Sequence, residues 1–340
     1  MDNTVLTHSK IRNNSLDCLK WISSFMVVCI HFRSYGEFGE LVSVLSRFAV
    51  PVFFMISGYY SASDKPDKLK TKIVHILKLY FGAVLLYLCF NVLVKVLAGQ
   101  YRETIWYLST YFRIRYLVPL LFFNESVTAF HLWFLGALIY AYGIEYLVTK
   151  WNIKDNILYV LAGVLLMIHL TLGIGRSAFG IEAPAFLVKN YMLRNVWLMG
   201  FPLFTFGKLI RKKKTEILKK VTAGVIGVFI VISIAEAFLL HQIDWSKDLY
   251  LGSVLLAFSL FILALKLKNR SYPSALIRLF ATGTDVYVIH VMIGNILAMT
   301  KLENVLVYQY GKPVIIFAVS VVISLAVRGR FRLTSKQVRV

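Results

Sequence analysis

Long apolar segments, separated by short polar ones, follow one another along the whole chain of 340 residues. A helix needs about 20 mostly apolar residues to cross a bilayer. The polar segments between them are too short to hold a soluble domain, so residues 1–340 are predicted to form a single all-α, polytopic membrane domain with no fused soluble domain. We predict ten membrane-spanning helices, at 16–33, 41–60, 73–98, 130–149, 156–173, 192–210, 221–240, 249–267, 280–300 and 313–327.

The amino-acid composition agrees with this class. The chain is 58% hydrophobic and 16% charged, whereas a soluble domain is nearer half apolar and about a quarter charged. Cys18, Cys29 and Cys89 all lie in apolar segments and indicate neither a disulfide framework nor a metal site. The sequence also lacks a phosphate-binding glycine loop, a dinucleotide fingerprint, an HExxH pair and a nucleophile elbow. These absences exclude the common soluble nucleotide-binding and metal-dependent enzymes.

Positive charge is concentrated in alternate polar segments. Lysine and arginine accumulate on the cytoplasmic side of membrane proteins, so this pattern predicts that both termini are cytoplasmic. The net charge of +21 requires no nucleic acid as a partner, because topology and attraction to anionic lipid headgroups explain it. A polyanionic cytosolic ligand is the alternative. Of the 38 Lys and Arg residues, 26 fall in 1–20, 61–80, 150–155, 208–220, 266–279 and 328–340.

The first predicted span carries three ionisable residues, in the stretch SLDCLKWISSFMVVCIHF. Lys20 and His31 are eleven positions apart, which places them within about 20° of each other round a helix and about 16 Å apart along it. Asp17 precedes Lys20 by three positions and can pair with it. Ionisable residues inside membranes usually face the bundle or a water path, so we predict a cavity open to the cytosol with His31 as its proton acceptor. Alternatively, Lys20 extends to the membrane surface and His31 marks the opposite interface.

Two motifs resemble the opening of acyltransferase family 3, an integral-membrane family. The family has a basic residue, ten intervening positions and a histidine in its first span, matched here by Lys20 and His31. It also has an Arg-x-x-Val-Pro-x-Phe-Phe-x-x-Ser-Gly segment in the second span, matched by RFAVPVFFMISG from Arg47 to Gly58. The segments KTKIVHILKLYF, HLWFLGALIYAY and TGTDVYVIH continue the similarity in the family's order.

The resemblance implies an enzyme that transfers an acetyl or other short acyl group. Its donor substrate is cytosolic acyl-CoA, with no permanently bound cofactor and no metal, and its acceptor is a hydroxyl of a cell-envelope glycan or lipid-linked sugar. The implied location is the cell membrane, as a multi-pass protein among membrane lipids, and a bacterial cytoplasmic membrane is expected. His31 is the implied catalytic residue. The implied donor-binding residues are Lys20, Ser57, Gly58, Tyr59, Lys72 and His75, and the supporting residues are Asp17, Arg47, Trp133 and His290.

The chain departs from the family pattern in two places. Lys72 and His75 occupy the positions where members often have Arg-x-x-Arg, and lysine lacks the planar fork with which arginine grips phosphate. Leu138 stands near the place where many relatives carry a glutamate after the tryptophan that corresponds to Trp133. A mechanism that relies on that glutamate is therefore not indicated.

Several features leave alternatives open. His290 either packs in the core or lines the cavity, and Glu236 either pairs with a neighbouring helix or faces the site. The segment 99–129 is predicted to be an interfacial amphipathic helix or a lid that contacts a sugar through Trp106 and Tyr107.

The alternative function is a transporter or flippase of a lipid-linked saccharide. Such a protein would also place polar residues in spans, but it favours internal repeats, and the sequence shows none. The oligomeric state stays open.

Overall fold

The described part of the chain is helical and contains no strand. The computed structural model describes residues 13–110, 113–126, 128–180, 182, 184, 187, 189–244 and 247–337. The helices are α1 (Asn14–His31), α2 (Glu37–Leu45), α3 (Ala49–Ser61), α4 (Pro66–Leu97), α5 (Tyr101–Thr110), α6 (Ile114–Phe123), α7 (Trp133–Lys150), α8 (Asp155–Leu170), α9 (Arg176–Phe179), α10 (Asn190–Leu193), α11 (Phe201–Lys212), α12 (Lys214–Lys220), α13 (Ala223–Asp244), α14 (Leu251–Lys266), α15 (Ser274–Phe280), α16 (Gly283–Ala298) and α17 (Leu306–Gln337). The predicted all-α class is confirmed.

Each of the ten predicted spans overlaps at least one of these helices. Among the residues that the structure describes, five helical stretches are long and apolar enough to cross a membrane, or up to seven if each of two bent helix pairs counts as one span. The chain is therefore a multi-pass membrane protein, and the count of ten stays a prediction. The five stretches are Glu37–Ser61, Pro66–Leu97, Phe130–Lys150, Asp155–Gly175 and Leu306–Gly329.

Local sequence signals explain where the site-bearing helices begin. The side chain of Asn13 caps α1 by accepting hydrogen bonds from the backbone N–H groups of Ser15 and Leu16. A 3₁₀ turn, Ser46–Phe48, separates α2 from α3. Pro51 lies in the first turn of α3, where its missing N–H breaks no helical hydrogen bond. The second predicted span is therefore two helices joined at Arg47.

A close approach of backbones holds α3 against α11. A Cβ atom added at Gly58 would lie 1.8 Å from the carbonyl oxygen of Phe204, and one added at Gly207 would lie 2.0 Å from that of Met55. Small residues allow this kind of packing between helices in membranes. Gly58 therefore has a packing role that is sufficient to require glycine at this position.

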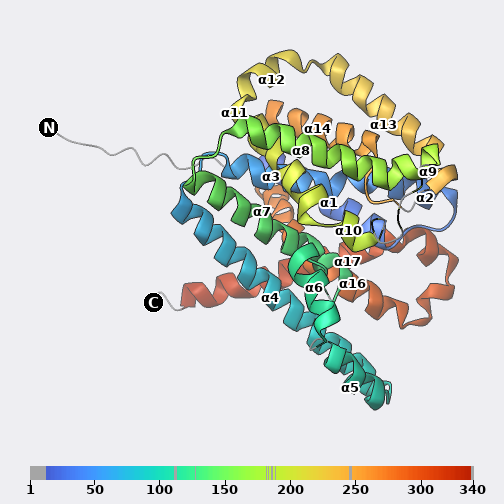
Figure 1. The fold of residues 1–340 in the computed structure, drawn as a ribbon. Helices are drawn as coiled ribbons and strands as arrows, with labels where there is room; N and C mark the ends of the chain where they lie inside the picture. Colours follow the sequence, from blue (N-terminus) through green and yellow to red (C-terminus); the bar gives the residue numbers. More distant parts are fainter. Residues whose placement is uncertain are drawn as a thin grey trace.

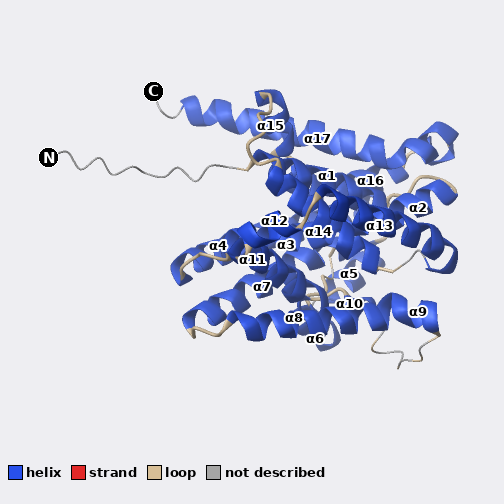
Figure 2. Ribbon diagram, turned by 90° about the horizontal axis from the view of Figure 1, so that it is seen from above, coloured by secondary structure: helices blue, strands red, loops and turns tan. Residues whose placement is uncertain are grey.

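The helices are arranged so that α1 and α3 lie inside the bundle (Figures 1 and 2). In Figure 2, α17 runs along one edge and α8 along the opposite edge, with α1, α16 and α3 between them. The α3–α4 link, the α7–α8 link and the end of α17 lie on the side of the bundle where α1 begins (Figure 2). The segment predicted as an amphipathic helix or lid contains α5 and α6, and α5 extends away from the bundle at the end of α4 (Figure 1).

Candidate functional site

A pocket of about 150 Å³ lies beside the C-terminal end of α1, and we call it the His31 pocket. It brings together three residues that the sequence singled out, His31, Arg47 and Trp133. They come from α1, from the turn before α3 and from the start of α7, so the pocket is built where three segments meet. Its remaining lining residues are Val27, Ile30, Val50, Phe130, Arg194, Met199 and Asp248.

Three histidine rings are grouped at this pocket. The ring of His31 stacks on that of His290 from α16, with 5.3 Å between centroids and 26° between planes. The ring of His131, from the 3₁₀ turn before α7, lies 5.2 Å from His290 and 6.3 Å from His31. His131 is 1% exposed and His290 is not exposed at all, whereas His31 is partly exposed and lines the pocket. His290 is thus in contact with the predicted catalytic residue.

A chain of three charges lines the same pocket. Asp248, just before α14, lies 3.3 Å from Nη1 of Arg47 and 2.6 Å from Nε of Arg194. Arg47 is only 8% exposed, and its Nε has no hydrogen-bond partner among the described residues. One carboxylate between two guanidinium groups leaves a net positive charge beside His31. Such a group can stabilise negative charge that develops in a reaction.

A second, larger pocket of about 330 Å³ lies beside the N-terminal part of α1, and we call it the Lys20 pocket. Five residues predicted from the sequence line it together: Asp17, Lys20, Ser57, Lys72 and His75. Apolar and aromatic side chains of α3, α4, α7 and α16 form the rest of the wall, including Phe53, Leu79, Phe134, Tyr142 and Tyr287. The pocket therefore combines cationic groups with an apolar interior.

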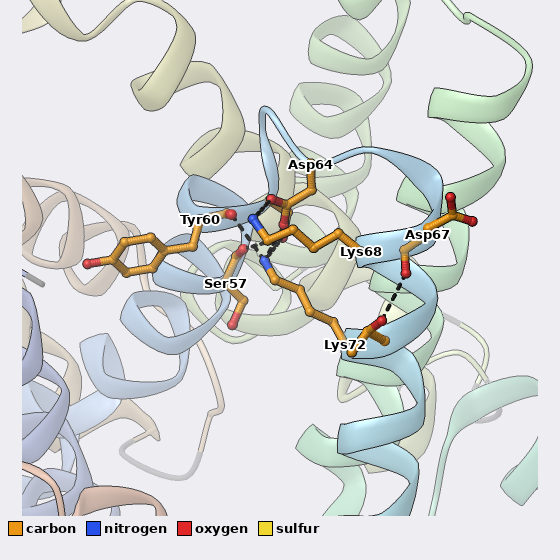
Figure 3. Close-up of polar contacts among 8 residues, drawn as sticks. Ser57, Tyr60, Asp64, Asp67, Lys68 and Lys72 are labelled. Carbon is orange, nitrogen blue, oxygen red and sulfur yellow. Dashed lines mark hydrogen bonds and ion pairs between the residues drawn. The ribbon is translucent and has the colours of Figure 1, made fainter. Parts of the chain in front are cut away.

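Asp64 holds the ammonium group of Lys72 at the edge of this pocket (Figure 3). Nζ of Lys72 lies 2.6 Å from the Asp64 carboxylate and donates to the carbonyl oxygen of Tyr60 at 3.0 Å. Lys68 also contacts Asp64. Burial acts to raise the pKa of Asp64, but the hydrogen bonds from Lys68 and Lys72 outweigh it and leave this pKa below its ordinary value. Lys72 is thus oriented by a carboxylate eight positions before it.

Two of the predicted donor-binding residues lie outside both pockets. Gly58 contacts the backbone of α11, as described above. Tyr59 packs its ring on Phe261, and its hydroxyl accepts a hydrogen bond from Nη1 of Arg211 at 3.2 Å. The next residue, Tyr60, lines the Lys20 pocket instead.

The two pockets are separate cavities that share no lining residue among those described. Aromatic rings stand at the end of the Lys20 pocket that faces the histidines. The ring of Phe134 lies 5.6 Å from that of Phe53 and 5.4 Å from that of Tyr287, and the Tyr287 hydroxyl donates to the carbonyl oxygen of His131. We call Phe53, Phe134 and Tyr287 the aromatic partition. The single cavity expected from the stripe on α1 is therefore divided in two.

Sequence reasoning did not single out His131, Arg194 or Asp248. His131 opens the segment HLWFLGALIYAY, so a signal for it was present in the motif. Asp248 offered none, because it lies in a short polar segment between predicted spans. Arg194 lies near the start of the predicted span 192–210, and it becomes notable only through its contact with Asp248. Glu236 accepts hydrogen bonds from the N–H groups of Leu251 and Gly252, so it caps α14 and does not line either pocket.

In the segment between α4 and α7, Tyr107 is tied to α4 and Trp106 is exposed. The side-chain amide of Asn91 on α4 donates to the Tyr107 hydroxyl at 2.7 Å. Trp106 is exposed on α5. Neither residue lines the His31 pocket, so a contact with a sugar stays a prediction for both.

Comparison with known proteins supports the family resemblance. No curated protein and no solved structure matches the chain significantly. A family model described as an acyltransferase domain does match it, and the match covers residues 13–327, nearly the whole chain. With the helical bundle and the histidine in α1, this match shows that the chain belongs to acyltransferase family 3.

Proposed function

We propose that this protein is a membrane O-acyltransferase that moves an acetyl or other short acyl group from cytosolic acyl-CoA to a hydroxyl of an envelope glycan or lipid-linked sugar. The observation that carries the proposal is the position of α1 beside both pockets. One face of this helix lines both pockets, with Lys20 in one and His31 in the other. Membership of an acyltransferase family supplies the reaction class.

The proposed topology has ten spans and both termini in the cytoplasm. The stretches 61–80, 150–155 and 328–340 carry 12 of the lysine and arginine residues. They contain the α3–α4 link, the α7–α8 link and the end of α17, which share one side of the bundle (Figure 2). Positive residues favour the cytoplasmic side. In this orientation the Lys20 pocket opens toward the cytosol and the His31 pocket lies toward the outer leaflet.

The Lys20 pocket is the proposed donor site. Coenzyme A carries several phosphate charges, and Lys20 on α1 and Lys72 and His75 on α4 supply basic groups to the lining of this pocket. Hydrogen bonds from an ammonium group to phosphate are charge-assisted and strong. The apolar wall suits the uncharged arm that carries the thioester, and it leads that arm toward the aromatic partition.

The His31 pocket is the proposed acceptor site. His31 takes the proton of the acceptor hydroxyl while the oxygen attacks the thioester carbonyl, and Arg47 stabilises the negative oxygen that forms. The carbon–sulfur bond then breaks, and the departing thiolate takes the proton from His31. A transient acyl group on His31 is an equally compatible route. In both routes the aromatic partition has to move so that the thioester reaches His31.

The arrangement of the pockets also favours a second candidate, a transporter or flippase of a lipid-linked saccharide. Two cavities on one helix face, divided by a partition, resemble the two half-paths of an alternating-access transporter. Such a protein would bind the saccharide without consuming a thioester. Turnover of acetyl-CoA therefore separates the two functions.

The test uses purified protein in detergent, acetyl-CoA and an envelope extract as the source of acceptor. Release of the CoA thiol is followed for the wild type, His31→Ala and His169→Gln, because His169 is a buried histidine outside both pockets. We expect His31→Ala to lower the rate by about 10²–10⁴-fold with acetyl-CoA binding unchanged, and His169→Gln to stay near wild type. Full turnover by folded His31→Ala contradicts the catalytic role of His31, and the absence of turnover by the wild type contradicts the enzyme. Saccharide movement without thiol release supports the transporter.

A further inference from the structure

The hydrogen bonds of His131 and His290 determine which nitrogen of each ring carries a proton. Nδ1 of His290 lies 2.9 Å from the carbonyl oxygen of Tyr287 and 3.1 Å from that of Val286. Nε2 of His131 lies 3.4 Å from the carbonyl oxygen of Val288. A carbonyl oxygen only accepts, so these nitrogens must donate. In a neutral ring the other nitrogen then holds a lone pair, namely Nε2 of His290 and Nδ1 of His131.

Both of these lone pairs are buried and lack a partner among the described residues. The neighbouring tyrosine hydroxyls have already used their protons, since that of Tyr87 donates to the carbonyl oxygen of Val288 and that of Tyr287 to that of His131. The Phe130 ring beside His31 offers no donor. Leaving a buried acceptor unsatisfied costs about 1–3 kcal/mol, so both of these lone pairs favour a donor within the cluster.

We infer that His131 and His290 are positioning residues that orient His31 and stabilise its protonated ring through their lone pairs. This inference rests on the proposed function. When His31 takes the proton of the acceptor hydroxyl, both of its nitrogens carry a proton. The inference requires that the ring of His31 then turns out of its stacked position on His290, so that one N–H donates to a lone pair. The thiolate then removes that proton, and the cluster returns to three neutral rings.

The charges around the histidine cluster explain why neutral acceptors beside His31 would help it to hold a proton. On the pocket side, Arg47 and Arg194 face His31, with only Asp248 between them. Two guanidinium groups oppose the formation of a third positive charge nearby. Two acceptors on the other side of His31 offset that opposition without adding a negative charge that would pair with the arginines.

Asparagine and glutamine variants test the inference because each replaces one ring nitrogen. The amide of asparagine occupies approximately the place of Nδ1, and that of glutamine the place of Nε2. At position 131, asparagine keeps an acceptor in the place of Nδ1, whereas glutamine keeps the hydrogen bond to the carbonyl oxygen of Val288. At position 290 the order is reversed. Glutamine keeps an acceptor in the place of Nε2, whereas asparagine keeps the hydrogen bonds to the backbone carbonyls. If the lone pairs matter, His131→Asn is faster than His131→Gln, and His290→Gln is faster than His290→Asn. A purely structural role predicts the reverse order at both positions.

The readout is thiol release from acetyl-CoA with envelope extract, measured for all four variants and for His169→Asn and His169→Gln as controls. Because a hydrogen bond to a charged group is at stake, we expect the two members of each pair to differ by at least about tenfold in kcat, in the crossed order, with an unchanged KM for acetyl-CoA. Melting temperatures confirm that each variant is folded. Equal rates within each pair, or the structural order, overturn the inference while His31→Ala stays inactive. An active His31→Ala overturns the proposed function instead.

Discussion

The Lys20 pocket and the His31 pocket lie along the same face of α1 but are assembled in different ways. The Lys20 pocket takes its polar residues from the start of α1, the end of α3 and the start of α4. Its anchoring contact is local, since Asp64 and Lys72 lie eight positions apart. In the His31 pocket the corresponding contact joins Arg47 to Asp248, 201 positions away.

The two anchoring contacts therefore depend on the rest of the fold to different extents. A local pair forms as soon as the α3–α4 link is in place, so the contact that orients Lys72 does not depend on the packing of distant segments. The Arg47–Asp248–Arg194 group forms only when three distant segments have packed, and Arg47 is nearly buried. Substitutions in the His31 pocket should therefore affect folding and chemistry, and those in the Lys20 pocket should affect donor binding.

Asp248→Asn is expected to have the largest effect on stability. It removes the carboxylate that separates two guanidinium groups and leaves a buried charge without compensation, which typically costs about 3–5 kcal/mol. We expect a sharp fall in the yield and melting temperature of the purified protein. Asp67→Asn is the matched control, because the Asp67 side chain is 97% exposed.

A double variant tests whether the charge is the cause. Adding Arg47→Gln to Asp248→Asn removes the more deeply buried of the two guanidinium groups that lost their carboxylate, so part of the stability should return even though activity stays low. If Asp248→Asn melts like the wild type, the three charges do not hold these segments together, and the contrast between the two pockets is lost.

Lys20→Ala is expected to have an intermediate effect, confined to the donor. A hydrogen bond to a charged group contributes about 1.5–3 kcal/mol, so KM for acetyl-CoA should rise by about ten- to a hundredfold, with kcat changed much less. Steady-state kinetics at several acetyl-CoA concentrations measure this. Lys70→Ala is the control, because Lys70 lies on the same helix as Lys72 but does not line the pocket. A fall in kcat with unchanged KM would place Lys20 in the chemistry and not in binding.

The sequence was sufficient to predict the all-helical class and most of the polar residues of the Lys20 pocket, but not the breaks within helices such as the turn at Arg47. Apolar length predicts where helices form, and the eleven-residue spacing from Lys20 to His31 predicts that both share one face. The motif residues Ser57, Lys72 and His75 then come together because they lie at adjoining helix ends. These are consequences of helical geometry and short links, which a sequence displays directly.

The His31 pocket was only partly predictable because it depends on how helices rotate and pack. Nothing in the residues around Asp248 or Arg194 indicates a partner, and His131 joins the cluster only through the placement of α7 against α16. Gly58 illustrates a related limit, since a glycine in a motif has the same appearance whether backbone or ligand approaches it. In this structure the backbone of α11 approaches it.

Asp64→Asn is expected to have the smallest effect and the most specific pH dependence. The pKa of Asp64 is lowered in the folded protein from an ordinary value of 3.8, after the hydrogen bonds from Lys68 and Lys72 outweigh burial. A lowered carboxyl pKa stabilises the folded state above the unfolded pKa, and this stabilisation is lost as pH falls through the folded pKa. It is therefore fully present at neutral pH and declines below about pH 3.8.

We expect Asp64→Asn to lower the melting temperature slightly at pH 7 and to match the wild type more closely as the pH falls below 4. Lys72 would also lose its carboxylate partner, so KM for acetyl-CoA should change. The change should be smaller than in Lys20→Ala, because no ammonium group is removed. An equal loss of stability at pH 7 and at pH 3 would show that the Asp64 side chain acts by shape and not by charge, and the local anchoring of the Lys20 pocket would then need another source.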